Sequence, residues 1–461
     1  MIKFTIITVF PNLHENFLDT SLVKIAKDGG LVDFDFVKLS DLTSPAERID
    51  EPTVGPGPGM ILKPSVIADA IEVAEKKHGA GYKIFFSPKG TPLTQTLLKD
   101  FSEAVLGASV LSNEIPSTQK HSKTSESKHI ILVCGRYEGI DARVEEHYAD
   151  LMLSIGDYVL MGGDLPAQVF LEGILRLIPG VLGNADSIET ESFQSTTLDH
   201  PEYGLPVEWK EKNIPEVLLS GHHKKINEWR EAEALRSTLE NRFDWFSRSE
   251  PSEDERAKAL EAIPPHYVIL MHDQILLKGG KVGTTSITSI DLHDISRSSA
   301  TYGIKKYFVV TPLEDQFHII KTFLNFWRSE DGAKYNPSRF KATALLHPVK
   351  SLDEAVAEIE KDTGSAPVLV TTCAKKHVTT KKIDFHSQGF IWKKEKPVGL
   401  IFGTGQGLSQ PVIDRSDFLL APLNGLSEYN HLSVRSAVGV ILDRWLGVNP
   451  KLLGHFDKDH C

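Results

Sequence analysis

The sequence predicts an α/β protein with two parallel-sheet modules, and three observations support this fold class. Short apolar runs of strand length, such as 131–133 and 151–155, alternate with segments of helical spacing. Both of these runs end in a glycine-containing turn. The same order, an apolar run followed by a Gly-rich turn and a capped helix, returns in the second half from residue 399. Alternating strands and helices are typical of parallel sheets.

The composition is that of a folded globular protein with more than one domain. The chain has 461 residues, of which 41% are hydrophobic and 25% charged, and this length is too great for one ordinary core. The net charge of −11 argues against non-specific polyanion binding by the whole surface. Local basic patches occur at 222–225, 375–382 and 393–396. Each patch is either part of a local basic groove or a solvated face.

The cysteines and the N-terminus indicate where the protein works. Cys134, Cys373 and Cys461 lie far apart without CxxC or His-pair spacing, so neither a disulfide framework nor a zinc site is indicated. The N-terminal apolar run is too short to span a membrane and lacks a small-residue cleavage site. We therefore expect a cytoplasmic protein with no membrane partner and no metal site.

The first half opens as a strand, helix and strand unit. The expected elements are strands over 3–9 and 33–38, helices over 14–27 and 65–77, a strand over 82–86 closed by a turn at 87–90, and a helix over 165–178 that starts at Asp164. The Pro/Gly-rich segment 51–60 predicts a loop. The polar, aperiodic segment 108–129 predicts a surface insertion.

The most informative stretch is 131–167, where two strands end in Gly-rich turns. CGRYEGID follows the run at 131–133, and SIGDYVLMGGDLPA continues the run at 151–155. Adjacent strand ends of this kind form a cleft at the carboxyl edge of a parallel sheet, where α/β proteins bind nucleotide-like ligands. Neither turn contains GxGxxG or GxxxxGK[ST], so a dinucleotide fold or a P-loop is not indicated.

The second half repeats this plan without repeating the residues. After a helical segment at 201–246 and an acidic segment at 247–262, apolar runs of strand length recur from 267 to 421, with a helix expected over 351–362. The run at 399–402 leads into GTGQG, and the segment NGLSEYNHLSVRSA at 424–437 predicts a loop and a capped helix.

These motifs resemble the bacterial tRNA (guanine-N1)-methyltransferase family, knotted SPOUT enzymes that use S-adenosylmethionine (SAM). The resemblance covers residues 1–242 and includes PGPGM at 56–60, SPKG at 87–90, RLIPGVLG at 176–183 and LLSGHHKKINEWR at 218–230. The second half resembles a SPOUT-type SAM-dependent RNA methyltransferase domain that some bacteria carry as a carboxyl-terminal fusion. The implied fold is two trefoil-knotted SPOUT domains with a small helical domain between them.

The resemblance implies SAM as the cofactor, and Mg²⁺ is considered as an additional one. In the first module the implied SAM contacts are Pro88, Gly135, Ile155, Gly156, Asp157, Tyr158, Val159, Leu160, Gly162 and Gly163. In the second module they are Gly403, Gly405, Gly407, Leu423 and Ser433. A single glycine of this kind is often only a turn residue, whereas the set as a whole favours a cofactor site.

The resemblance also implies the reaction, which is methyl transfer to N1 of guanosine 37 in tRNA. Removal of the N1 proton requires a carboxylate base and a cation near O6. Arg176 matches the family's arginine, and Glu191 stands where the family has an aspartate, with Asp186 and Glu189 as nearby alternatives. The residues implied to bind the nucleic acid are Glu138, Gly59, Ser220, His222, Arg230 and, in the second module, Arg297.

The expected organisation follows from these motifs and linkers. The domains are a SPOUT domain at 1–184 with an insertion at 108–129, a linker at 185–200, a tRNA-binding helical domain at 201–246, an acidic linker at 247–262, a second SPOUT-like domain at 263–449 and a tail at 450–461. Family members are homodimers with the active site between subunits, so tRNA and a second copy are the expected partners. Alternatively, only one module is catalytic, and the second binds SAM or RNA, or forms dimers, without transferring a methyl group.

Overall fold

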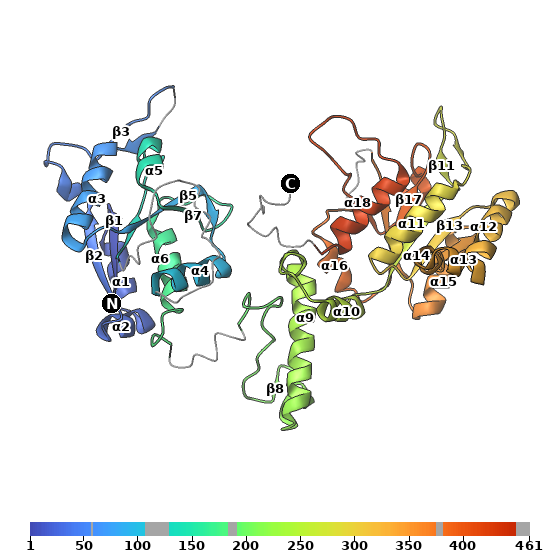
Figure 1. Ribbon diagram of the computed structural model, residues 1–461, viewed down its shortest axis with the longest axis horizontal. Helices are drawn as coiled ribbons and strands as arrows, with labels where there is room; N and C mark the ends of the chain where they lie inside the picture. The colour runs from blue at the N-terminus through green and yellow to red at the C-terminus, as the bar shows by residue number, and fades with distance from the viewer. Residues whose placement is uncertain (57–58, 107–128, 183–190, 375–380, 449–461) are drawn as a thin grey trace. The chain divides into compact units, whose positions relative to one another are not determined.

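The computed structural model describes residues 1–56, 59–106, 129–182, 191–374 and 381–448. The chain divides into two compact units, Met1–Gln194 and Ser195–Cys461. Each unit has a central parallel sheet covered by helices, so the predicted α/β class is confirmed (Figure 1). Apart from its last residue, the insertion at 108–129 lies outside the described residues, as does the tail at 450–461. Among the helices described, none is both long and apolar enough to cross a membrane.

The first unit is built on a five-stranded sheet in the order β2-β1-β6-β5-β7. All four strand pairs are parallel. Every residue of the central β6 is buried, as expected for a parallel strand covered on both faces. The strands are β1 Ile2–Thr8, β2 Val32–Lys38, β5 Tyr82–Pro92, β6 His129–Val133 and β7 Leu151–Ser154, and a separate hairpin is formed by β3 Asp50–Pro52 and β4 Met60–Leu62.

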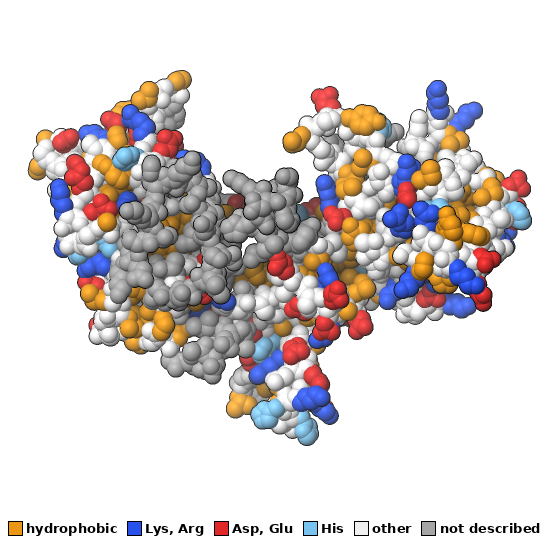
Figure 2. Space-filling view, in the orientation of Figure 1, with side chains coloured by type: hydrophobic (Ala, Val, Ile, Leu, Met, Phe, Trp, Pro, Cys, Tyr) orange, Lys and Arg blue, Asp and Glu red, His pale blue; other side chains and the backbone are white. Residues whose placement is uncertain are grey.

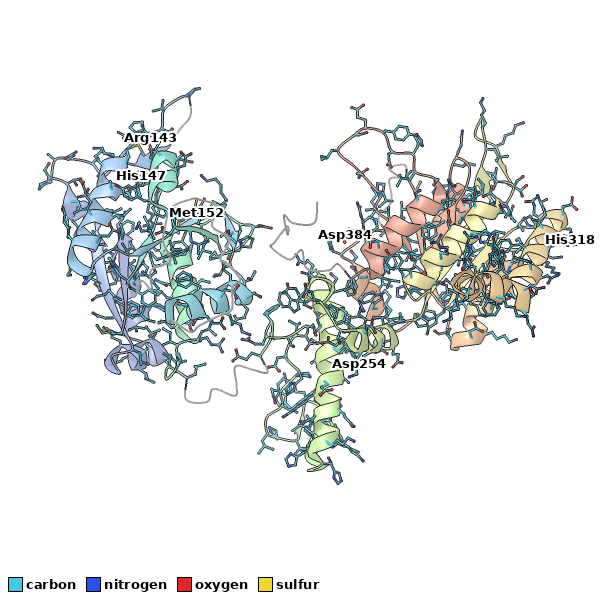
Figure 3. The ribbon with its side chains drawn as sticks, viewed as in Figure 1. Arg143, His147, Met152, Asp254, His318 and Asp384 are labelled. Atoms are coloured by element: carbon cyan, nitrogen blue, oxygen red, sulfur yellow. The ribbon has the colours of Figure 1, made fainter. Side chains whose placement is uncertain are left out.

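Helices cover both faces of this sheet and bury two apolar clusters. One face packs against α1 Asn12–Leu18, α2 Ser21–Asp28, α4 Gln95–Leu106 and α6 Asp164–Leu175. The other packs against α3 Pro64–His78, α5 Ala142–Tyr148 and the short 3-10 helix η1 Leu39–Leu42. Helix α5 is capped by Asp141, which accepts hydrogen bonds from the Arg143 backbone amide and guanidinium. Arg143 is labelled in Figure 3. This arrangement places β6 in the middle of the sheet and β7 at its edge, with their carboxyl ends free to form a site.

Two predicted elements of this unit were wrong in detail. The single helix expected over 14–27 is split into α1 and α2, because Thr20 is an extended N-cap and Ser21 has φ of 38°. The strand expected to end at residue 86 continues to Pro92 with a register shift between Phe86 and Thr91. Gly90 permits this path, since a Cβ there would lie 2.6 Å from the Leu153 backbone nitrogen.

The second unit contains a seven-stranded parallel sheet in the order β14-β13-β10-β17-β15-β18-β16. The strands predicted from the apolar runs of this half are confirmed. They are β10 His266–Met271, β13 Lys306–Val310, β14 Leu346–Val349, β15 Val368–Thr372, β17 Val398–Gly403 and β18 Phe418–Leu420, with the short β16 Lys382–Ile383 at the edge and a hairpin of β11 Ile275–Leu276 and β12 Val282–Gly283.

Helices again cover both faces of the second sheet. One face packs against α11 Ser289–Thr301, α12 Glu314–Trp327, α16 Gln388–Trp392 and α18 Val434–Leu446. The other packs against α15 Leu352–Thr363, close to its predicted range, and α17 Gln410–Arg415. Helices α13 Glu330–Tyr335 and α14 Pro337–Thr343 lie beside α11 and α12. As in the first unit, the carboxyl ends of the central strands β10 and β17 are left open for a site.

The segment 201–246 is part of this second unit. It holds a hairpin of β8 Glu208–Trp209 and β9 Lys212–Asn213, the short α8 Glu216–Leu219 and α9 His223–Arg248, which is kinked at Arg242. Leu239 and Phe246 of α9 share an apolar cluster with Trp392 of α16. The acidic segment at 247–262 carries helix α10 Glu253–Ala262 rather than an irregular connector, because Ser252 and Glu255 form a capping box at its start; Asp254 is labelled in Figure 3.

Candidate active sites

The first pocket lies at the carboxyl ends of β6 and β7, next to the register shift of β5 between Phe86 and Thr91. Its volume is about 280 Å³, near the lower end of the range for small-molecule sites. Nine of the ten residues predicted to contact the cofactor line it: Pro88, Gly135, Ile155, Gly156, Tyr158, Val159, Leu160, Gly162 and Gly163. Asp157, the tenth, is exposed and does not form part of the wall. Arg136 and Tyr137, which the sequence reasoning did not single out, also line the pocket.

Close backbone contacts hold the two turns of this pocket together. Arg136 and Gly162 form an isolated antiparallel bridge, and the Gly163 amide donates to the Gly135 carbonyl at 2.8 Å. The Arg136 guanidinium donates to the Met161 carbonyl at 2.9 Å. A Cβ on Gly163 would lie 2.9 Å from both the Cys134 Cα and the Gly135 nitrogen. The glycines are therefore required for the turns to meet, which favours a pocket shaped for a ligand that contacts the backbone.

A buried cluster of polar side chains packs against these turns. The Asp164 carboxylate accepts from the Thr8 hydroxyl at 2.5 Å, lies 3.2 Å from His14 Nε2 and lies 3.7 Å from Arg136 Nε. Burial, together with the nearby Asp164 charge, raises the pKa of the Cys134 thiol. His14, Cys134 and Asp164 bring metal-binding atom types within 4.8 Å of one another. Mg²⁺ prefers an all-oxygen shell, so the cluster fits a structural network better than a magnesium site.

Glu138 and Gly59, both predicted to contact the nucleic acid, meet at the rim of this pocket. Glu138 lines the pocket, and its backbone amide donates to the Met60 carbonyl at 3.0 Å. Gly59 has φ of 145°, and a Cβ on it would lie 2.5 Å from the Glu138 Cγ. Gly59 therefore packs directly against the Glu138 side chain, and a larger residue would not fit at this position.

The predicted catalytic pair, Arg176 and Glu191, forms an ion pair within the first unit. Arg176 is the C-cap of α6, and its guanidinium donates to Glu191 Oε1 at 2.5 Å. The two side chains are 37% and 29% exposed, and neither lines the pocket. Asp186 and Glu189, the alternative bases, lie outside the described residues. The arginine and the acid are thus placed together but away from the cofactor turns of their own chain.

The predicted tRNA contacts lie at the start of α9. Ser220 and His222 are exposed, and the Ser220 hydroxyl accepts from the His222 amide at 3.2 Å. Arg230 is half-buried, and its Nε is an atom for which the described part of the chain supplies no hydrogen-bond partner. Figure 2 shows histidine and basic side chains gathered at the tip of this helix. The exposed His222, His223, Lys224 and Lys225 form this local basic patch on an otherwise acidic protein.

The second pocket is larger, about 1180 Å³, and lies at the carboxyl ends of the central strands of the second sheet. All five predicted cofactor residues line it: Gly403, Gly405, Gly407, Leu423 and Ser433. Arg297 is exposed on α11 and is not in the wall. The sequence reasoning missed His272, Thr285, Asp291, Thr404 and Arg435, which also line the pocket. His272 directly follows the apolar run of β10, and this strand-end position is the signal that could have identified it.

Both pockets fit the chemistry of SAM. The adenosine of SAM binds to backbone amides and apolar side chains, and the sulfonium of SAM needs no metal to react. The first pocket offers Ile140, Pro166 and Tyr158 beside the turns, and the second offers Leu423 and Phe402. Two such clefts, each at the carboxyl edge of a parallel sheet, are typical of α/β proteins that bind nucleotide-type cofactors.

Comparison with known proteins identifies the family. Residues 2–106 and 110–248, more than half of the chain, match the family described as tRNA (guanine-1)-methyltransferase TrmD. Residues 265–447 match a family described as SAM-dependent RNA methyltransferase. The chain therefore belongs to the tRNA (guanine-1)-methyltransferase family and carries a second, SAM-dependent RNA methyltransferase domain.

Similar proteins include both longer and shorter relatives. A tRNA (guanine-N(1)-)-methyltransferase of Oleidesulfovibrio alaskensis is 35% identical and covers 96% of this chain and 99% of its own length. One of Nitratidesulfovibrio vulgaris is 34% identical with the same coverage. One of Dictyoglomus turgidum is 35% identical but covers 55% of this chain and 94% of its own length. The two-module organisation is thus shared with full-length relatives, whereas other relatives match little more than half of the chain.

Adding one methyl group at Gly163 should distort the first pocket. The new Cβ of Gly163→Ala would meet the backbone of Cys134 and Gly135 at 2.9 Å, and neither atom can move without separating the two turns. We expect SAM binding by the first module to weaken at least tenfold, measured by calorimetry. Gly204→Ala is the control, because a Cβ there has no neighbour within 4 Å. Unchanged binding by Gly163→Ala would show that the turns can separate without cost.

Proposed function

We propose that this protein transfers a methyl group from SAM to N1 of guanosine 37 in tRNA, using the pocket between the 134–139 and 155–163 turns. The observation that carries the proposal is the gathering of the family's cofactor residues around one pocket, with Glu138 at its edge. The relatives of similar sequence are named tRNA (guanine-N(1)-)-methyltransferase. Because tRNA is a cytoplasmic molecule, we expect the reaction in the cytoplasm.

The residues of the chain have separate tasks in this proposal. SAM, when bound, supplies an electrophilic methyl group on its sulfonium. The Gly-rich turns and Pro88 hold it and fix its direction. Arg176 stabilises the negative charge that forms on the guanine O6, and Glu191 accepts the N1 proton. Glu138 contacts the guanine, and Ser220, His222 and Arg230 contact the tRNA. Any magnesium dependence is tested by adding a chelator and restoring Mg²⁺.

We propose that the active site is completed by a second copy of the chain. Arg176 and Glu191 do not line the pocket of their own unit. The surface beside that pocket exposes apolar side chains, including Met161 at 86%, Leu165 at 54% and Val169 at 47%, as expected for a face that another chain covers. Phe10, which lies 4.7 Å below the Arg136 guanidinium, extends this apolar face. The SAM turns of one subunit would then meet the ion pair of its partner.

Mixed dimers test this arrangement. At limiting SAM, Gly163→Ala and Glu191→Gln chains are each expected to have strongly reduced activity alone, so co-expressed mixed dimers recover activity only if the turns and the base come from different subunits. No recovery in purified mixed dimers would place the complete site within one chain.

We propose that the second pocket also binds SAM and serves an RNA methyltransferase, and that both modules are knotted SPOUT domains as the resemblance implies. Two parallel sheets with glycine turns at their carboxyl edges support this reading. Calorimetry should give two SAM molecules per chain. Incubation with unmodified tRNA and labelled SAM, followed by nucleoside analysis, should give 1-methylguanosine. Its absence would refute the proposed function of the first module.

A further inference from the structure

A chain of hydrogen bonds lies in the wall of the second pocket. His272 Nδ1 lies 3.0 Å from the Thr285 hydroxyl oxygen, which lies 2.6 Å from the Thr404 hydroxyl oxygen. The Thr404 hydroxyl donates to the Met271 carbonyl at 3.0 Å. His272 follows β10 and Thr404 follows β17, and these strands are neighbours in the sheet, with Met271 paired to Gly403. These hydrogen bonds therefore connect His272 to the turn that is predicted to hold the cofactor.

The direction of each hydrogen bond in this chain is fixed. A carbonyl oxygen only accepts, so the single hydroxyl proton of Thr404 is used on Met271. The Thr404 oxygen must then accept the hydroxyl proton of Thr285. Thr285 therefore has no proton left to donate to a second partner. Thr285 can only accept from the imidazole, so the proton of neutral His272 is on Nδ1. The remaining nitrogen, Nε2, carries a free lone pair.

The environment of this lone pair points to a ligand. His272 is 1% exposed, and no hydrogen-bond partner for Nε2 occurs among the residues that the structure describes. Asp291 also lines the pocket, and its Oδ1 likewise has no hydrogen-bond partner there; the nearest cation is the Arg435 guanidinium at 3.6 Å. Leaving buried acceptors unpaired is unfavourable, so a ligand with an O–H or N–H group would relieve this cost.

We propose that His272 Nε2 accepts the proton of the RNA group that the second module methylates. The inference rests on the second pocket being a SAM-dependent RNA methyltransferase site, as proposed above. In the step, the acceptor oxygen or nitrogen forms a bond to the methyl carbon, the bond from that carbon to sulfur breaks with its electron pair left on sulfur, and the acceptor's proton passes to Nε2. The acceptor is therefore a hydroxyl or a protonated ring or exocyclic nitrogen, and not an unprotonated ring nitrogen or a carbon.

The surroundings of His272 suit this task. Burial lowers the pKa of His272 to about 4, with Asp291 opposing the shift, so the imidazole is neutral and its lone pair available at neutral pH. Such an imidazole is a weak base. However, an oxygen or nitrogen that is gaining a methyl group becomes strongly acidic, and a weak base is then sufficient. The Asp291 carboxylate would stabilise the imidazolium that results.

The tautomer is tested without any turnover. Nitrogen NMR of ¹⁵N-histidine-labelled protein should show His272 with its proton on Nδ1. Thr285→Val removes the acceptor and should abolish this preference, whereas Thr285→Ser keeps the hydroxyl and should retain it. A proton on Nε2 in the unsubstituted protein would overturn the inference.

Turnover is tested with total RNA from a strain that lacks this gene, using labelled SAM and nucleoside analysis. His272→Gln should lower the second methylated nucleoside about 100-fold while 1-methylguanosine is unchanged. SAM binding to the second pocket, measured in the Gly163→Ala background, should stay within about twofold. Thr285→Val should lower the second product about tenfold, and Thr285→Ser should retain it.

The outcomes separate the two proposals. No second nucleoside from the unsubstituted protein would refute the methyltransferase function of the second module, and this inference with it. A second nucleoside made at the full rate by His272→Gln would refute only the role of His272. A product methylated on carbon or on an unprotonated ring nitrogen would likewise refute the proton transfer. Parallel loss of SAM binding would make His272 a cofactor contact instead.

Discussion

Replacing Glu191 by glutamine is expected to lower 1-methylguanosine formation by roughly 100-fold or more, the usual contribution of a general base. Glutamine keeps the size of the side chain and can still accept from Arg176 through its amide oxygen, but it cannot take the N1 proton. SAM binding should persist, because Glu191 does not line the cofactor pocket. Single-turnover rates with unmodified tRNA, together with calorimetric SAM binding, measure both effects.

The matched control is Glu191→Asp, which introduces the residue type that the resemblance implies for this position. Aspartate retains the acid chemistry with one methylene less, so we expect it to keep most of the activity or to increase it. Asp186→Asn and Glu189→Gln test the alternative bases. If Glu191→Gln stays fully active while Asp186→Asn or Glu189→Gln is inactive, the base is that residue and Glu191 only positions Arg176.

Much of the fold could be predicted from sequence because its signals are local. The apolar runs that form β6, β7, β10 and β17 are buried strands, and the glycine turns that follow them line the two pockets. The break between α1 and α2 was missed because helical spacing continues through Asp19 and Thr20. The extension of β5 depends on pairing with β7, which no local pattern reports.

The parts of the sites that sequence reasoning missed depend on residues far apart in the chain. The hydrogen-bond chain of the second pocket joins residues 272, 285 and 404, none of which belongs to a recognisable motif together with the others. The ion pair of Arg176 with Glu191 and the contact of Gly59 with Glu138 were not predicted either, although each residue had been singled out. Such contacts depend on tertiary packing. A sequence motif can therefore predict the residue types of a site but not how these residues are arranged.

Acidification from pH 7 to pH 4 is expected to destabilise the second unit by about 6 kcal/mol, a large part of the stability of a typical domain. Two of its buried histidines carry the effect. Burial lowers the pKa of His266 and of His272 to about 4, from an unfolded value near 6.5. His266 Nε2 accepts from the indole N–H groups of Trp392 and Trp445, both at 3.2 Å, and protonation would break both bonds.

The sign follows from proton binding. Between pH 6.5 and 4 the unfolded histidines bind protons that the folded ones do not, so stability is full above about pH 6.5 and falls as the pH approaches 4. Each histidine contributes about 3 kcal/mol for a pKa difference of about 2.5. Some carboxyl groups of this unit, such as Asp244 and Glu255, have a lowered pKa in the folded state. Their protonation also destabilises the unit, but mainly below the range of pH 6.5 to 4.

Urea unfolding at pH 7.0, 5.5 and 4.0, followed by tryptophan fluorescence, measures this effect for the second unit alone. All six tryptophans lie after residue 194, so the first unit does not contribute to the signal. His266→Gln is neutral throughout, and its amide oxygen can still accept from an indole N–H. It should therefore lower stability at pH 7 but reduce the loss on acidification by about half. If His266→Gln showed the same pH dependence as the unsubstituted protein, His266 would not cause the loss of stability. The buried imidazole would then be protonated in another way, such as through local opening of the structure to water before the unit unfolds.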